Sequence, residues 1–181
     1  YIGGQFTTVG GTARGRIAAI GTDGTLSSWN PNANSDVNAI AVLGSTVYIG
    51  GSFTAIGATA RKNAAAIGTD GTPAAWNPGP NARVGLIADV GGSPYLGGTF
   101  SMVGGVDRSY LAAMAPDGTL TSWAPTVDAA VNAIVLDGST VYIGGAFINV
   151  NGTARNRAAA MDSGGTLTAW DPNVSGTVST M

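Results

Sequence analysis

The strongest constraint on the fold is a repeat of 47 residues that runs through the whole chain. The pattern Tyr-(Ile/Leu)-Gly-Gly-x-Phe starts at Tyr1, Tyr48, Tyr95 and Tyr142, with no insertion or deletion between the copies. A fixed period of about 20–50 residues is typical of repeat architectures, in which each repeat buries its hydrophobic face against the next. The sequence therefore predicts a chain built from four similar units.

Each repeat contains four short apolar runs separated by turn residues. In the second repeat these runs are Val37–Val42, Thr46–Gly51, Lys62–Ile67 and Thr72–Trp76. Glycine-containing turns, including Asp70-Gly71, separate neighbouring runs and favour tight hairpins. The alanines of the third run are too few for a helix, so strand is the better interpretation. The remaining segment, 52–61, is predicted to be a polar connection.

Four short antiparallel strands joined by tight turns make up one blade of a β-propeller. We therefore expect an all-β fold, a β-propeller of four 47-residue, four-stranded antiparallel blades within a single domain, 1–181. The expected boundaries are 1–31 for blade 1, 37–78 for blade 2, 84–125 for blade 3 and 131–172 for blade 4.

The two ends of the chain align with parts of one blade. Tyr1 aligns with the second strand, and Val178–Met181 aligns with Val37–Ile40, the first strand. One alternative is a closed four-blade ring in which Val178–Met181 pairs with Tyr1–Gly4. The other is a piece of a larger propeller of about six to eight blades. We favour the larger propeller, because a shortened closing strand is a weak clasp.

Large aromatic residues recur at fixed positions and predict the packing between blades. The tryptophans fall on the fourth strand, where neighbouring blades diverge, and we expect their rings to fill that space. They are Trp29, Trp76, Trp123 and Trp170. A phenylalanine follows each glycine pair and is expected to anchor the polar connection. These residues are Phe6, Phe53, Phe100 and Phe147.

The composition excludes several classes of function. The chain has a net charge of −2 and only 10% charged residues, so no basic stripe is available for a nucleic acid. It lacks Cys, His and Glu, which removes thiol and imidazole chemistry and the usual zinc ligands. No carboxylate pair converges in the pattern. We therefore expect no enzyme activity, catalytic residue, cofactor or metal, and no apolar run is long enough to span a membrane.

Arginines at one repeated position are the first candidate binding residues. They are Arg14, Arg61, Arg108 and Arg155. A ring of guanidinium groups at a channel mouth would bind an anion or a sulfated glycan. Alternatively, each arginine binds carbonyl groups of its own loop or stacks on the tryptophan of a neighbouring blade, and repetition in every unit favours this structural role.

Residues that break the repeat are the second group of candidates. Asp107 and Tyr110 flank Arg108 in the third repeat. The other repeats have Ala at the position of Asp107, and Arg or Asn at the position of Tyr110. Pro78–Pro80 and Arg83 form another cluster that is specific to one repeat. Asp23, Asp70 and Asp117 lie in turns that contain glycine. Turn formation explains these aspartates better than calcium binding does.

The recurring motifs resemble those of the delta-60 repeat β-propellers, a bacterial family related in architecture to WD-repeat and kelch propellers. The matching elements, in order, are V-x-A-I, VYIGGxFT, GGTAR, DGTL and W-x-P, and they cover the whole chain. The chain departs from them at Asp107, Tyr110 and Ser163–Gly165. The resemblance implies an extracellular or cell-surface location, which a chain poor in Lys and rich in Thr, Gly and Asn also fits.

We therefore expect a non-enzymatic extracellular or cell-surface scaffold that binds protein or glycan, or assembles, through the loops at blade edges. One alternative is a propeller enzyme or a carbohydrate- or anion-binding domain that uses the repeated arginines. Another is a subunit of an extracellular filament or sheath that self-assembles through unpaired strand edges.

Overall fold

The computed structural model describes all residues, 1–181, and contains strands but no helix. Nineteen short strands form three three-stranded and five two-stranded sheets. All strand pairs are antiparallel. The predicted all-β fold is confirmed.

The strands group into four units that follow the sequence repeat. Unit 1 contains β1 (Ile2–Gly3), β2 (Thr8–Val9), β3 (Thr12–Ala13) and β4 (Ile17–Ala18). Unit 2 contains β5 (Val37–Leu43), β6 (Thr46–Gly51), β7 (Ala55–Ile56), β8 (Thr59–Ala60) and β9 (Ala64–Ile67). Unit 3 contains β10 (Val84–Val90), β11 (Ser93–Gly98), β12 (Met102–Val103), β13 (Val106–Asp107) and β14 (Leu111–Ala113). Unit 4 contains β15 (Val131–Asp137), β16 (Thr140–Gly145), β17 (Asn149–Val150), β18 (Thr153–Ala154) and β19 (Ala158–Asp162).

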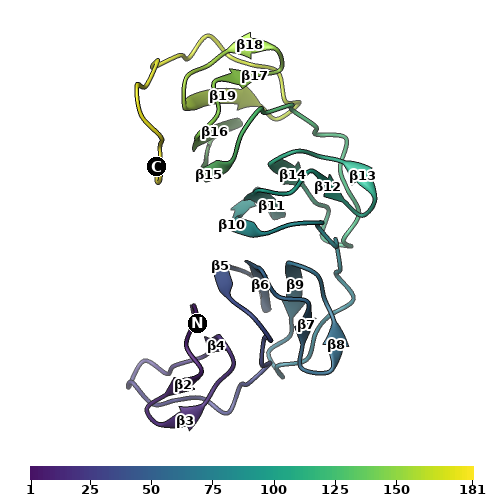
Figure 1. Cartoon of the computed structure of the whole chain (residues 1–181), viewed down its shortest axis with the longest axis vertical. Coiled ribbons are helices and arrows are strands. Elements are labelled where there is room, and N and C mark those ends of the chain that lie inside the picture. The colour runs from purple at the N-terminus through teal and green to yellow at the C-terminus, as the bar shows by residue number, and fades with distance from the viewer.

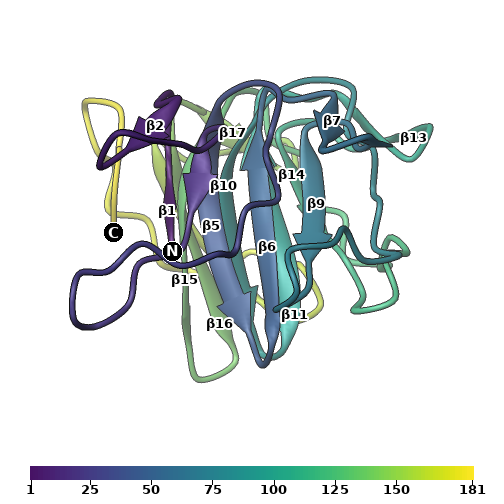
Figure 2. The same ribbon diagram turned by 90° about the horizontal axis from the view of Figure 1, so that it is seen from below.

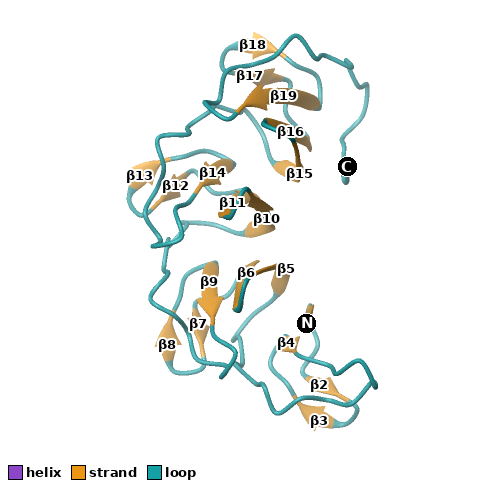
Figure 3. Cartoon of the chain, turned by 180° about the vertical axis from the view of Figure 1, so that it is seen from behind, coloured by secondary structure: helices purple, strands orange, loops and turns teal.

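The four units follow one another along an open arc (Figure 1). In units 2 to 4 the first strand, β5, β10 or β15, lies on the concave side, and the hairpin strands β8, β13 and β18 lie on the convex side. The same order is visible from behind in Figure 3. Figure 2 shows the small hairpins with β2, β7, β13 and β17 at one end of the molecule, and the β5–β6 and β15–β16 turns at the other. We call these the hairpin end and the turn end.

The sheets are smaller than the predicted four-stranded blades. Each full unit has a three-stranded sheet, such as β5-β6-β9, and the fourth run is reduced to a single bridge, Ile67 with Pro73 in unit 2. The equivalent residue is a leucine in the other units, and it too forms a single bridge, so the proline is not the cause. The carbonyl oxygen of Ala74 accepts a hydrogen bond from Arg61 at 2.7 Å. An arginine side chain thus replaces the strand partner.

The connection after the second strand also differs from the prediction. Residues 52–61 contain the hairpin β7–β8, in which Ala55 pairs with Ala60 and Ile56 with Thr59. Two-residue strands carry no detectable alternation of polar and apolar residues, and for this reason the sequence did not reveal them.

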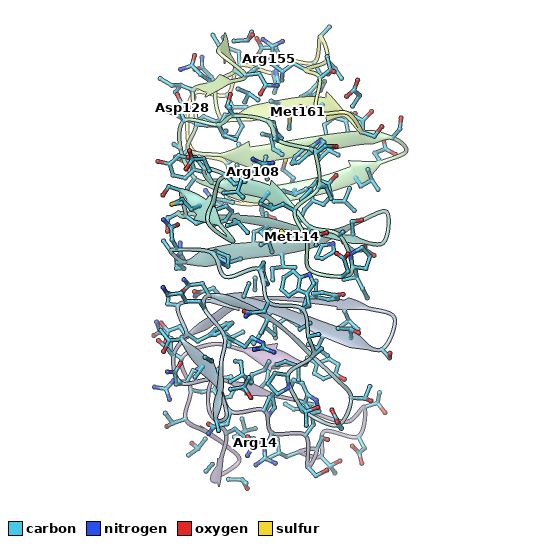
Figure 4. All side chains as sticks on the ribbon, turned by 90° about the vertical axis from the view of Figure 1, so that its right-hand side faces the viewer. Arg14, Arg108, Met114, Asp128, Arg155 and Met161 are labelled. Atoms are coloured by element: carbon cyan, nitrogen blue, oxygen red, sulfur yellow. The ribbon has the colours of Figure 1, made fainter.

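The hydrophobic core is divided into three clusters, and each cluster lies between two successive units. Trp29 of unit 1 packs with Phe53 and Ile67 of unit 2. Trp76 of unit 2 packs with Phe100 and Met114 of unit 3. Trp123, Phe147 and Met161 repeat the arrangement between units 3 and 4. Figure 4 labels Met114 and Met161 in their two layers. The stability of each unit therefore depends on its neighbour.

The tryptophan ring covers the equivalent glycine turn at each junction. The Nε1 of Trp29 donates a hydrogen bond to the carbonyl oxygen of Gly68 at 2.9 Å, and its ring covers the turn at Gly71. Trp76 covers Gly118 and Trp123 covers Gly165, but the Nε1 atoms of these two rings have no hydrogen-bond partner. The positive φ of Gly71, 83°, and its lack of a side chain suit both the turn and the ring above it. In unit 4 no glycine turn lies over the ring of Trp170, which is 39% exposed.

The glycine pair of the repeated motif is explained by a close approach between units. A Cβ on Gly50 would lie 2.5 Å from the Cγ1 of Val84, the first residue of the next unit. The second glycine, Gly51, donates its N–H to the carbonyl oxygen of Asn63 at 2.9 Å. The N–H of Asn63 bonds the carbonyl oxygen of Phe53, also at 2.9 Å, and Phe53 is fully buried. The motif is therefore a packing element.

The chain ends do not pair with each other. β1 is paired with β4 alone, and residues 178–181 belong to no strand. The N–H of Val178 instead donates to the carbonyl oxygen of Gly145 at 3.1 Å, just as Val37 donates to that of Gly4 at 3.2 Å. The tail thus occupies, against unit 4, the place that β5 occupies against unit 1. Closure through Val178–Met181 and Tyr1–Gly4 of one chain is not formed.

Candidate functional site

The four repeated arginines each form the same hydrogen bonds within their own unit. One guanidinium nitrogen donates to the carbonyl oxygen of the preceding residue and the other to a carbonyl oxygen 13 residues later. For Arg14 these acceptors are Ala13 at 2.8 Å and Ser27 at 2.7 Å. The weakest of the set is Arg108, at 3.5 Å from Thr121.

These arginines do not meet in one place. Figure 4 shows Arg14, Arg108 and Arg155 at different levels of the molecule, in different units. Only Arg155 forms an ion pair, with Asp171 at 3.7 Å. Each guanidinium joins the small hairpin of its unit to the segment that precedes the tryptophan. The arginines therefore hold their own units together. They do not form an anion-binding ring.

Asp107 and Arg108 lie side by side at the hairpin of unit 3. With Ser109 and residues 124–127 they line a hollow of about 230 Å³. Tyr110 is not part of this hollow. Its backbone is left-handed, with φ of 67°, and it exchanges hydrogen bonds with Gly98 and Phe100. Arg16, Asn63 and Arg157 have the same conformation at the same position, so this backbone feature belongs to the repeat.

The turn aspartates accept hydrogen bonds from groups of their own turns. The carboxylate of Asp70 accepts hydrogen bonds from the N–H and the hydroxyl of Thr72, at 3.0 and 2.8 Å. These bonds, the backbone one first, lower the pKa of Asp70 below its ordinary value of 3.8. Asp117 has the same bonds and a lowered pKa, and so does Asp23, for which the hydroxyl of Thr25 is the larger cause. Each carboxylate stabilises its own turn.

The largest hollow of the chain lies between units 3 and 4, where the first strands begin. Its volume is about 370 Å³. Its polar lining includes Arg83, Asn132 and Ser179, together with the backbone at Gly85 and Gly98. Because Val84 pairs with Gly98 just before the β12–β13 hairpin, the hollow lies toward the hairpin end, on the inner rim of the molecule.

Two departures from the repeat create this hollow. The first strand of each full unit begins with a β-bulge, whose extra residue is Asn38, Gly85 or Asn132. Gly85 lacks the side chain of the two asparagines, and the space is left to the guanidinium of Arg83, about 3.6 Å from where a Cβ would lie. In unit 2 the residue that corresponds to Arg83 is Asp36, whose carboxylate accepts a hydrogen bond from Gln5 at 2.8 Å.

The chemistry of the hollow suits an anion. The only ion pair of the chain joins Arg155 to Asp171, so Arg83 has no carboxylate partner. Its guanidinium, the amide of Asn132 and the hydroxyl of Ser179 are all hydrogen-bond donors. The amide of Asn132 also donates to the carbonyl oxygen of Val178, at 3.2 Å, which holds the tail at this edge of the hollow.

The sequence predicts that Arg83 forms a cluster with Pro78–Pro80. The structure places Arg83 in one hollow with Asn132 and Ser179, which the sequence prediction did not include. The signal that would have located the hollow was the pair of changes at one place in the repeat, Asp to Arg at position 83 and Asn to Gly at position 85.

No three His, Cys, Asp or Glu residues lie close enough together to bind a metal ion. The structure contains no helix with the length and hydropathy needed to cross a bilayer. No protein-family model matches the chain, and no curated protein matches its sequence.

Proposed function

We propose that the chain is a β-propeller module whose four units are blades, and that it acts as a non-enzymatic scaffold outside the cell or at its surface. It binds protein or glycan partners through the loops and bulges of the hairpin end. The resemblance to the delta-60 repeat propellers supports both the blade arrangement and the location.

The observation that carries this proposal is the threefold repetition of one junction. The contact of a tryptophan with the following glycine turn occurs between units 1 and 2, 2 and 3, and 3 and 4, with the same residue types each time. Such a junction sets successive sheets side by side around an axis, as in a propeller. A framework of this kind is rigid, and it leaves the short loops free to vary.

The contacts of the repeated side chains also favour a scaffold over an enzyme. The repeated arginines and turn aspartates bond groups of their own units, so they hold the framework rather than a substrate. The residues that vary from unit to unit at the rim, Asp36, Arg83 and Ala130, are those that a partner would distinguish.

A second candidate function is the binding of an anionic carbohydrate at the Arg83 hollow. The unpaired guanidinium beside two neutral donors favours it. A carboxylate or sulfate group would accept a bidentate hydrogen bond from Arg83. This places anion binding at one specific arginine instead of at the four repeated ones.

Calorimetric titration with a sulfated oligosaccharide tests these assignments. Arg83→Gln is expected to weaken binding about fivefold, about 1 kcal/mol, as for a solvent-accessible ion pair. Lys62→Gln removes the same charge from an exposed side chain and is expected to leave the affinity unchanged. Arg61→Gln is expected to lower the stability of unit 2 without weakening binding. If Arg61→Gln weakens binding while Arg83→Gln does not, the hollow is not the site and the repeated arginines are.

A further inference from the structure

We infer that the hollow beside Arg83 binds a carboxylate on a polyhydroxylated molecule, and that this ligand is a uronic acid residue of an acidic polysaccharide. The inference rests on the second candidate function and narrows it from anionic carbohydrates in general to carboxylated sugars. Its evidence is the set of hydrogen-bonding groups that the changes at positions 83 and 85 of the repeat leave at the wall of the hollow.

The first of these groups is the guanidinium of Arg83. It forms no ion pair and no hydrogen bond within the chain, whereas a repeated arginine such as Arg61 donates two hydrogen bonds to its own unit. Its terminal nitrogens lie 3.6 and 3.7 Å from where a Cβ of Gly85 would stand, so the guanidinium is turned toward the bulge of β10. A guanidinium presents a planar fork of N–H groups that matches the two oxygens of one carboxylate. Arg83 is therefore a free bidentate donor.

No carboxylate of the lining competes for Arg83. The residue equivalent to Arg83 is Asp36 in unit 2 but Ala130 in unit 4, and Ala130 is part of the wall. None of the seven lining residues is acidic. The chain as a whole has a net charge of −2 and does not attract a polyanion at long range, so recognition has to come from groups inside the hollow.

The second group is the main-chain carbonyl of Val131, the first residue of β15 and part of the wall. In unit 4 the bulge residue Asn132 donates its amide to the carbonyl oxygen of Val178 at 3.2 Å. One repeat earlier, the bulge residue is Gly85 and the equivalent carbonyl is that of Val131. Gly85 has no side chain that could donate to it. In unit 2 the bulge residue is Asn38, which forms no such bond but occupies the bulge, so only unit 3 leaves this space open.

Together the two groups define the chemistry of the ligand. Arg83 requires a pair of acceptor oxygens, and the carbonyl of Val131 requires a hydroxyl in the place of an asparagine amide. A uronic acid carries a carboxylate and hydroxyls on one ring and so supplies both. A carboxylate also uses both arms of the fork with no oxygen left over, whereas a sulfate ester has a third terminal oxygen that needs a further donor.

The lining favours a sugar over a side chain of a protein partner. Only Ala130 and Val131 of its seven residues are hydrophobic, and none is aromatic. Protein partners are anchored mainly by aromatic and apolar contacts in desolvated pockets, which this hollow does not provide. Its volume of about 370 Å³ lies in the range of small-molecule sites. Because no ring stacks on the sugar, hydrogen bonds alone hold it, and we expect a dissociation constant of about 1 mM.

Titration of the whole chain with an oligosaccharide of galacturonate, followed by nitrogen-15 NMR, tests the inference. The main-chain N–H signals of Gly85, Gly98 and Asn132 should shift, because these residues line the hollow. The same oligosaccharide with methyl-esterified carboxyl groups keeps its hydroxyls but loses its charge, and it should bind at least about tenfold more weakly. An ester that binds equally well overturns the inference, and so does an unshifted Gly85.

Gly85→Asn tests whether the open bulge is the binding site. Units 2 and 4 have asparagine at this position, so the variant is expected to fold, and its amide should fill the space and donate to the carbonyl of Val131. Binding of the oligogalacturonate should weaken at least about tenfold. Gly79→Asn is the matched control, since Gly79 lies outside the hollow with a φ of 57°, and units 1 and 4 have asparagine there with similar φ values. The control should bind normally, and normal binding by Gly85→Asn contradicts the inference.

Three further probes separate the possible ligands. An oligoaspartate peptide that binds more tightly than the oligogalacturonate assigns the hollow to a protein partner and overturns the inference. Lactate that binds as tightly as the oligosaccharide makes a free hydroxy acid the ligand and removes the polysaccharide. If only a sulfated oligosaccharide binds through Arg83, the inference fails and the second candidate function stands. If neither sugar binds, both fail.

Discussion

At the scale of single residues, the tryptophans differ in burial although they occupy the same place in the repeat. Trp76 is 3% exposed and lies at a junction, whereas Trp170 is 39% exposed at the end of the molecule. Trp76→Ala is therefore expected to lower the free energy of unfolding by about 3–5 kcal/mol, as for a large aromatic residue removed from a core. Trp170→Ala should lower it by less than about 1 kcal/mol in dilute protein. Urea denaturation followed by far-ultraviolet circular dichroism measures both, and equal losses would contradict the junction.

Glycine residues provide a second comparison at this scale. A Cβ on Gly50 would lie 2.5 Å from Val84, whereas on Gly85 its nearest contact would be Arg83 at 3.6 Å. We expect Gly50→Ala to destabilise the fold by about 1–3 kcal/mol through overpacking, and Gly85→Ala to be nearly neutral. The same denaturation measurement applies. A neutral Gly50→Ala would show that units 2 and 3 are not in close contact at the glycine pair.

At the scale of the elements, the repeat predicted the first three runs of each unit well, because β-branched residues and glycine turns bound them clearly. It overestimated the fourth run, which forms only a single bridge in every unit and whose carbonyl oxygen accepts a hydrogen bond from the repeated arginine. It missed the β7–β8 hairpin, which is too short to show a period. The Arg83 hollow could be predicted only in part: the changes at positions 83 and 85 mark its place in the repeat, but its lining comes from two neighbouring units and the tail.

The aspartate turns give a prediction of pH dependence. Hydrogen bonds from Thr25, Thr72 and Thr119 lower the pKa values of Asp23, Asp70 and Asp117 below 3.8 in the folded chain. A lowered folded pKa stabilises the fold above the unfolded value, and this contribution is lost as the pH falls through the folded pKa. The free energy of unfolding should therefore decline below about pH 3.8.

Replacing all three aspartates by asparagine tests this origin, because asparagine keeps an acceptor oxygen but does not titrate. The decline at low pH should become shallower in the triple variant. Part of it should remain, because Asp128 also has a lowered pKa: burial alone would raise it, but hydrogen bonds from Asn149 and the backbone of Ile148 outweigh burial. An identical decline in both proteins would place the acid sensitivity elsewhere.

At the scale of the whole molecule, the resemblance and the repeat predicted a propeller, and the observed chain is an open arc of four units. The arc follows from its junctions, since each one joins a unit only to the next. Whether such an arc closes depends on its two end faces, which a repeat pattern does not describe.

Small-angle X-ray scattering of the wild-type protein in solution tests this account most directly. The account predicts the scattering profile of an open arc in which four similar units follow one another. The profile of a compact particle, in which the four units do not follow one another along an arc, would contradict it.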